Sequence, residues 1–418
     1  MAHRSGNWLA SLMPGIFLIG YNIGTGSLTA MSKAGANYGT GMLWAVLVSC
    51  LITWYLINFF SRFTMASGMT AMEACRKHIH PVYAWALWGG LTLIILSALM
   101  GMIGLLADVV VTGFRELAGV KVDRAASGVA IALVVLGLLW IGNTRRLEAM
   151  LGVMVALMGL AFIGTAVRFF PGVEETLHGF VPKLPGRAEG SDNSPWVILA
   201  GMVGTTVSVF AFLIRSGQVK EHGWTMEHWK IQKRDALVSA SMMFVLSASV
   251  LLTATATLHK QGLKMNAIDE MIPMLRPVFG NAAMGVFVIG ILAAGLSSHM
   301  PNMMVIPWLT RDLNGRSRMT RTPAFLWTLV LLTGVGILGA GFESRPVFLM
   351  LMSQAGISIV MPLALLGLMW LSARPETTGA PAPRKIEWLL LGLIAAFSLA
   401  MGFLALRGLI TDLQQMIS

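Results

Sequence analysis

Long apolar runs, separated by short polar connections, dominate this chain. Eleven of them have the roughly 20 mostly apolar residues that a membrane-spanning helix needs. These runs are residues 12–31, 39–61, 82–107, 126–143, 149–168, 195–214, 235–258, 282–309, 323–341, 346–371 and 386–411. Longer polar connections occur near 169–194 and 259–281. The pattern predicts an all-α polytopic membrane protein.

The order of the apolar runs permits an internal symmetry. If the first five (about 12–168) and the next five (about 195–371) are inverted repeats, the first and sixth spans occupy equivalent places. The last run, about 386–411, is then an extra helix outside the repeats. We therefore expect a single transmembrane transporter domain over residues 1–418.

Small and polar residues interrupt both of these equivalent spans. The first contains Gly24-Thr25-Gly26-Ser27, and two nearby glycines lower helix propensity by about 1 kcal/mol each. The sixth contains Gly201, Gly204, Thr205, Thr206 and Ser208. Unpaired backbone groups are costly in hydrocarbon, so a break indicates a cavity or a ligand. Close packing of small residues is the alternative. Paired breaks favour a binding site near the middle of the membrane.

Composition supports the bilayer as the solvent and excludes other partners. Hydrophobic residues make up 56% of the chain and charged residues 12%, against about 25% charged in soluble domains. The net charge of +11 is spread over many short loops and forms no single basic face, so we expect membrane lipid and no nucleic acid as partner. We expect no cofactor. Cys50 and Cys75 are too few for a disulfide scaffold and are predicted to pack.

The basic residues also give an orientation. With a cytoplasmic N-terminus, 18 of the 30 Lys and Arg residues fall on the inner side, which the positive-inside rule favours. No cleavable signal precedes the first apolar run. We predict an integral protein of a prokaryotic inner (plasma) membrane with its N-terminus in the cytoplasm.

Several segments, in the right order, resemble a known family. They are Gly20-Tyr21, Ala34-Gly35, Tyr38-Gly39 and Leu43-Trp44 near the first span, Gly68 to Arg76, Ala293 to Ser298, Leu351 to Gln354 and Met361-Pro362. Together they are similar to the Nramp family, proton-coupled divalent metal transporters. The resemblance covers most of the chain. It implies a LeuT-type fold of two inverted five-helix repeats plus an eleventh helix, with helices 1 and 6 broken.

The residues that hold metal in that family are mostly replaced here. The first-helix signature Asp-Pro-Gly-Asn corresponds to Gly24-Thr25-Gly26-Ser27, and the sixth-helix signature Met-Pro-His corresponds to Ser208-Val209-Phe210. Thr205 falls where the family offers a backbone carbonyl, and Gln354 is retained. The resemblance therefore implies a related but divergent member without the family's metal-site motifs.

The candidate substrate-binding residues are all uncharged. They are Asn22, Gly24, Thr25, Gly26, Ser27, Thr205, Thr206, Ser208, Phe210 and Gln354. A divalent cation in the membrane interior usually requires compensating negative charge. We therefore predict a small organic solute, such as an amino acid or a carboxylate, with its anionic group at a half-helix N-terminus.

Two other functions stay open. One is a divalent metal transporter of the Mn, Fe or Mg class with a neutral site, whose alternative ligands are Ser27, Thr205, Ser208 and Gln354, with His299 as a further candidate. The other is a membrane sensor or scaffold that does not transport. The sequence contains no HExxH motif, no GxSxG motif and no paired intramembrane carboxylates, so no motif in it indicates an enzyme.

Alternating access is the expected mechanism, but its coupling ion, H⁺ or Na⁺, stays open. The positions that resemble the family's acidic proton path are Ala98 and Gly101. His299 is a candidate proton carrier, because imidazole titrates near neutral pH; a neutral histidine bonded between helices is the alternative. Arg215 is predicted to anchor a span end at the cytoplasmic surface, and the scattered methionines to fill the core.

Overall fold

The described part of the chain is helical. The computed structural model describes residues 21–22, 24–141, 145–183, 186, 188–191, 193–318, 322–341 and 346–417. Within these ranges no strand occurs, and nine helical stretches are long and apolar enough to cross a membrane. The prediction of an all-α polytopic membrane protein is confirmed. Residues 12–20 of the first predicted span, and the N-terminus predicted to be cytoplasmic, lie outside the described residues.

Each predicted span corresponds to one helix or to a pair of helices. The long helices are α3 (Leu43–Ser67), α5 (Pro81–Ala118), α6 (Arg124–Ile141), α7 (Arg145–Arg168), α11 (Trp229–Thr257), α13 (Ala283–Leu313), α14 (Pro323–Gly341), α15 (Pro346–Ser372) and α17 (Lys385–Ile417). The shorter ones are α2 (Thr25–Tyr38), α4 (Ala71–Ala74), α8 (Val173–His178), α9 (Pro195–Thr206), α10 (Val209–Glu221), α12 (Ile272–Phe279) and α16 (Pro375–Thr378).

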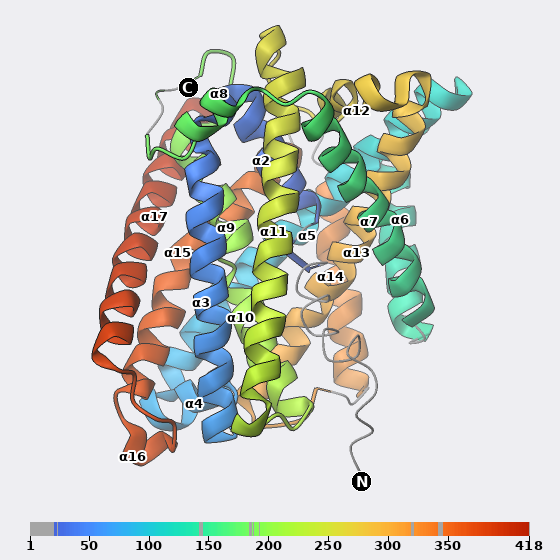
Figure 1. Cartoon of the computed structure of the whole chain (residues 1–418). Helices are drawn as coiled ribbons and strands as arrows, with labels where there is room; N and C mark the ends of the chain where they lie inside the picture. Colours follow the sequence, from blue (N-terminus) through green and yellow to red (C-terminus); the bar gives the residue numbers. More distant parts are fainter. Residues whose placement is uncertain are drawn as a thin grey trace.

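The sixth span, made of α9 and α10, lies at the centre of the helix bundle. Its apolar stretch is 100% buried inside the protein, against 28% for the apolar stretch of α6. Helix α15 packs against α5, α9 and α17, and α2 packs against α9 and α11. Figure 1 shows α17 along one edge of the bundle and α6 and α7 along the opposite edge. The interrupted spans are thus enclosed by the others.

The sixth helix breaks at two residues. Helix α9 ends at Thr206 and α10 begins at Val209, while Val207 (ψ 60°) and Ser208 (ψ 117°) leave the helical conformation. The end of α9 is capped from α3, because Thr53 Oγ1 donates to the Thr206 carbonyl at 2.7 Å. That bond satisfies one of the carbonyls that a helix end leaves unpaired. The predicted interruption of this helix is confirmed.

The first helix breaks slightly earlier than the sequence suggests. Tyr21 and Asn22 are helical, Gly24 is extended (φ −115°, ψ −162°), and the first bond of α2 runs from Leu28 N to Gly24 O at 3.0 Å. Residues 25–27, predicted to belong to the break, therefore form the first turn of α2. Their N–H groups have no acceptor within the helix. Gly26 lies in this turn without a side chain, and a Cβ there would lie 2.5 Å from Gln354 Nε2, so close packing explains glycine at this position.

A buried ion pair joins α10 to α11. Arg215 Nη2 lies 2.5 Å from Asp235 Oδ2, and both side chains are at most 2% exposed. Gln232 Oε1 accepts from Arg215 Nε at 3.0 Å, and the guanidinium lies 5.2 Å from the Trp224 ring centre. Arg215 is therefore a buried packing element, and the prediction of an anchor at the surface is wrong for this side chain.

Candidate functional site

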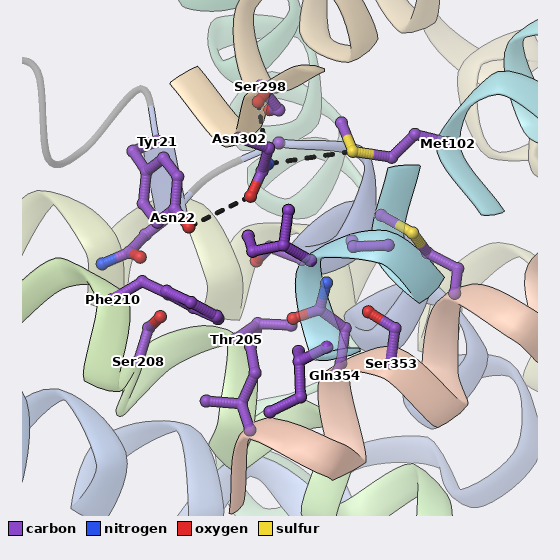
Figure 2. Close-up of a pocket in the computed structure, with 18 residues that line it drawn as sticks. Tyr21, Asn22, Met102, Thr205, Ser208, Phe210, Ser298, Asn302, Ser353 and Gln354 are labelled. Atoms are coloured by element: carbon purple, nitrogen blue, oxygen red, sulfur yellow. Dashed lines mark hydrogen bonds between the residues drawn. The ribbon is translucent and has the colours of Figure 1, made fainter. Parts of the chain in front are cut away.

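One cavity lies between the two helix breaks. It contains about 430 Å³ of free space, including its open side. Helix 1 and its break, α5, the α9–α10 break, α13 and α15 all contribute to its wall (Figure 2). The lining residues are Tyr21, Asn22, Gly24, Gly26, Ser27, Ile94, Ile95, Ala98, Met102, Thr205, Ser208, Phe210, Ser298, Asn302, Met350, Ser353, Gln354 and Ile357.

Most residues proposed from the sequence meet at this cavity. Those that line it are Asn22, Gly24, Gly26, Ser27, Thr205, Ser208, Phe210 and Gln354. Thr25 and Thr206 do not line the cavity. The Thr206 hydroxyl donates to Met202 O at 3.2 Å, and the Thr25 side chain is wholly buried. His299 is also outside the lining and faces Gly336 of α14. A coupling role for His299 stays a prediction.

Two glycines bring the backbone of helix 1 close to other helices. A Cβ placed on Gly24 would lie 1.6 Å from Ser298 Oγ, and one on Gly26 would lie 2.5 Å from Gln354 Nε2. Ser298 therefore occupies the space that a side chain at position 24 would need. The family resemblance places a carboxylate at position 24. The packing of α13 against helix 1 leaves no room for that side chain.

A polar network on α13 was not predicted from the sequence. Tyr21 Oη donates to Asn302 Oδ1 at 3.1 Å, and Asn302 Nδ2 donates to Ser298 O at 2.8 Å and to Met102 Sδ at 3.8 Å (Figure 2). The one available signal was an asparagine inside an apolar span. Met102 and Met350 both line the cavity, which corrects the prediction that the methionines only fill the core.

Two fully buried oxygen atoms of lining side chains have no hydrogen-bond partner. They are Asn22 Oδ1 and Ser353 Oγ, on side chains that are 6% and 3% exposed. Buried polar atoms in proteins are nearly always bonded, so these two are positions for water or for a ligand. The described lining contains no Asp, Glu, Lys, Arg or His. The cavity is thus polar but carries no side-chain charge.

We predict that Gly24→Ala destabilises the protein by about 1–3 kcal/mol, the usual cost of overpacking. The added methyl group collides with Ser298 Oγ. Thermal unfolding in detergent should show the loss, and Ser298→Gly should recover most of it in the double variant. Gly89→Ala is the control, because a Cβ there meets nothing within 4 Å. Equal effects of the two alanine substitutions would contradict the packing.

Two broken helices facing one central cavity define a secondary transporter of the LeuT type. The family described as "Natural resistance-associated macrophage protein-like", or Nramp, matches residues 15–408. The chain belongs to the Nramp family, as its motifs indicate.

Two relatives with curated names are bacterial proteins. A divalent metal cation transporter MntH of Acidiphilium cryptum is 26% identical over 378 residues, covering 86% of this chain and 82% of that protein. An MntH of Deinococcus radiodurans is 26% identical over 394 residues, covering 89% and 85%. Both matches span nearly the whole transmembrane domain.

Solved structures agree on the fold. The Eremococcus coleocola manganese transporter, in complex with an aromatic bis-isothiourea compound, superposes with a TM-score of 0.71 at 15% identity and covers 99% of this chain and 97% of its own. Mhp1, a nucleobase-cation-symport-1 family transporter in a closed conformation, gives 0.60 at 14% identity, covering 97% and 90%. The LeuT-type architecture is shared with both.

Proposed function

We propose that this membrane protein is a secondary transporter that carries a divalent metal cation of the Mn²⁺ type through the central cavity. Family membership supports the proposal, as do relatives named divalent metal cation transporters. The comparisons favour this metal alternative over the organic solute that the neutral residues suggested. The preference changes because of these relatives, and the structure adds Met102 and Met350 to the donor residues that the sequence indicated.

The observation that carries the proposal is the donor set. Asn22 Oδ1 and Ser353 Oγ are buried oxygen atoms without partners on the cavity wall. Oxygen ligands suit Mn²⁺ and Mg²⁺, and a thioether adds a softer donor that favours transition metals. Ser208 replaces the methionine of the family signature, but Met102 and Met350 supply thioethers to the same cavity from α5 and α15.

Alternating access would expose this cavity to each side of the membrane in turn. The part of this space that water molecules can enter is about 40 Å³, which holds about three of them at about 10–15 Å³ each. A cation that keeps part of its hydration shell needs fewer protein ligands. Coupling to H⁺ or to Na⁺ is a separate proposal that uptake at different pH values and Na⁺ concentrations would test.

The test is uptake of radioactive Mn²⁺ into proteoliposomes, in a medium that contains chloride, phosphate and small carboxylates. Saturable uptake above that of empty liposomes is expected. Ser353→Ala should weaken the apparent Mn²⁺ affinity by about tenfold, the effect of losing one polar contact to a charged ligand. Ser32→Ala is the matched control, because the Ser32 hydroxyl on α2 is equally buried and unpartnered but lies outside the lining. Absence of saturable uptake would overturn the proposal.

A small organic solute is the second candidate, and one observation favours it. Residues 25–27 present N–H groups without helical acceptors at the start of α2, and Gly26 and Ser27 line the cavity. A helix N-terminus of this kind attracts anions. Saturable uptake of a carboxylate or an amino acid that needs no metal would select this candidate.

A further inference from the structure

The electrostatics of the cavity do not suit a bare divalent cation. No charged side chain lies among its described lining residues, and Gly24 stands where the family places an aspartate. A cation with two charges is expensive to hold in the membrane interior without negative charge nearby. In addition, the N-terminus of α2 carries about half a positive elementary charge and repels a cation. The described lining of the cavity supplies no negative partner for the cation.

The start of α2 forms a pole of hydrogen-bond donors. The first helical bond is Leu28 N to Gly24 O, so the N–H groups of residues 25–27 precede the hydrogen-bonded part of the helix. The Gln354 amide nitrogen lies beside Gly26, only 2.5 Å from where a Cβ would be. Gln354 thus adds N–H donors to those of the backbone. Such a cluster binds a carboxylate group without any basic side chain.

Acceptor atoms form a second pole in the same cavity. Asn22 Oδ1 and Ser353 Oγ are more than nine-tenths buried and have no partner. Thr205, near the C-terminus of α9, adds the negative end of a second helix dipole. Oxygen atoms without donors indicate a cation or its bound water. The cavity therefore offers donor groups to an anion, and acceptor atoms on the walls that carry Asn22 and Ser353 to a cation or its water (Figure 2).

We propose that the cargo is a neutral one-to-one complex of a divalent cation with a small dicarboxylate. This inference rests on the proposed function and specifies its substrate. Two negative charges cancel two positive charges, which matches a cavity without charged side chains. One carboxylate binds at the N-terminus of α2 and the cation lies toward Asn22 and Ser353. The dicarboxylate supplies the negative charge that Gly24 does not.

Doubly labelled uptake into proteoliposomes tests the complex, with radioactive Mn²⁺ and malate carrying a different label. We expect both labels to enter in a one-to-one ratio, each requiring the other. Acetate and citrate, whose complexes with Mn²⁺ keep a net charge, should support at least about tenfold less uptake.

The other outcomes separate this inference from the proposed function. Equal Mn²⁺ uptake in chloride alone overturns the neutral complex and leaves metal transport standing. Malate uptake without Mn²⁺ overturns both and selects the organic-solute transporter. Uptake of neither label in any medium also overturns both. Gly137→Leu is the control for expression and reconstitution of a variant protein, because a Cβ at this position on α6 meets nothing within 4 Å.

Discussion

Gly26→Leu should abolish Mn²⁺ uptake, reducing it by about 100-fold or more, a loss that a 1 Å displacement of positioning groups can cause. The new side chain starts 2.5 Å from Gln354 Nε2 and 3.1 Å from Met350 Cε, so it must enter the cavity and displace both. It occupies the volume that the cation and its water need. Initial uptake rates in proteoliposomes, at equal amounts of reconstituted protein, measure the effect.

Gly137→Leu is the matched control for this prediction. It places the same side chain on α6, where an added Cβ meets nothing within 4 Å. Its uptake should stay within about twofold of the unmodified protein, as expected for a half-buried site where an added side chain meets open space. Gly26→Leu must also unfold at a temperature close to that of the control, which separates a blocked cavity from a misfolded protein. Normal uptake by folded Gly26→Leu protein would contradict a route through the cavity.

Asp235→Ala should destabilise the protein by about 3–5 kcal/mol, because it leaves the buried Arg215 charge without its carboxylate. The pair is 2.5 Å apart and at most 2% exposed. Gln232 continues to accept from Arg215 but carries no charge. Thermal unfolding in detergent, followed by the intrinsic fluorescence of the tryptophans, measures the loss.

An exposed ion pair provides the comparison. Arg115 and Glu116 are about half exposed, at 54% and 48%, so Glu116→Ala should cost no more than about 1 kcal/mol. The double variant Arg215→Met with Asp235→Leu should be more stable than Asp235→Ala alone, since two apolar residues leave no buried charge. A small effect of Asp235→Ala, equal to that of Glu116→Ala, would show that Arg215 reaches water.

The membrane-spanning pattern could be predicted because lipid offers the backbone no hydrogen-bond partners. A chain in hydrocarbon must bond its own N–H and C=O groups, so length and hydropathy alone indicate each helix. The breaks were harder to place. Gly201 and Gly204 looked like part of the sixth-helix interruption, yet both belong to α9. Gly204 lets α9 approach α15, since a Cβ there would lie 2.1 Å from Gln354 O. Sequence does not separate a packing glycine from a helix-breaking one.

The cavity residues close to the helix breaks were predicted from the sequence. The cavity residues that distant helices contribute were not predicted. Tyr21 and Asn302 are 281 positions apart and meet only because α13 lies against helix 1. Met102 and Met350 were indistinguishable from other apolar residues, because their role depends on which face of a helix they occupy. The family comparison identified the missing carboxylate, but only the structure shows Ser298 occupying the space beside Gly24.

Anomalous X-ray diffraction from crystals grown with Mn²⁺ and malate tests most directly whether the cavity holds the cation. The account predicts one strong manganese peak inside the cavity, within about 2–2.6 Å of Asn22 Oδ1 or Ser353 Oγ, as for oxygen ligands of hard cations. A manganese peak only outside the cavity, in protein that takes up Mn²⁺, would contradict it.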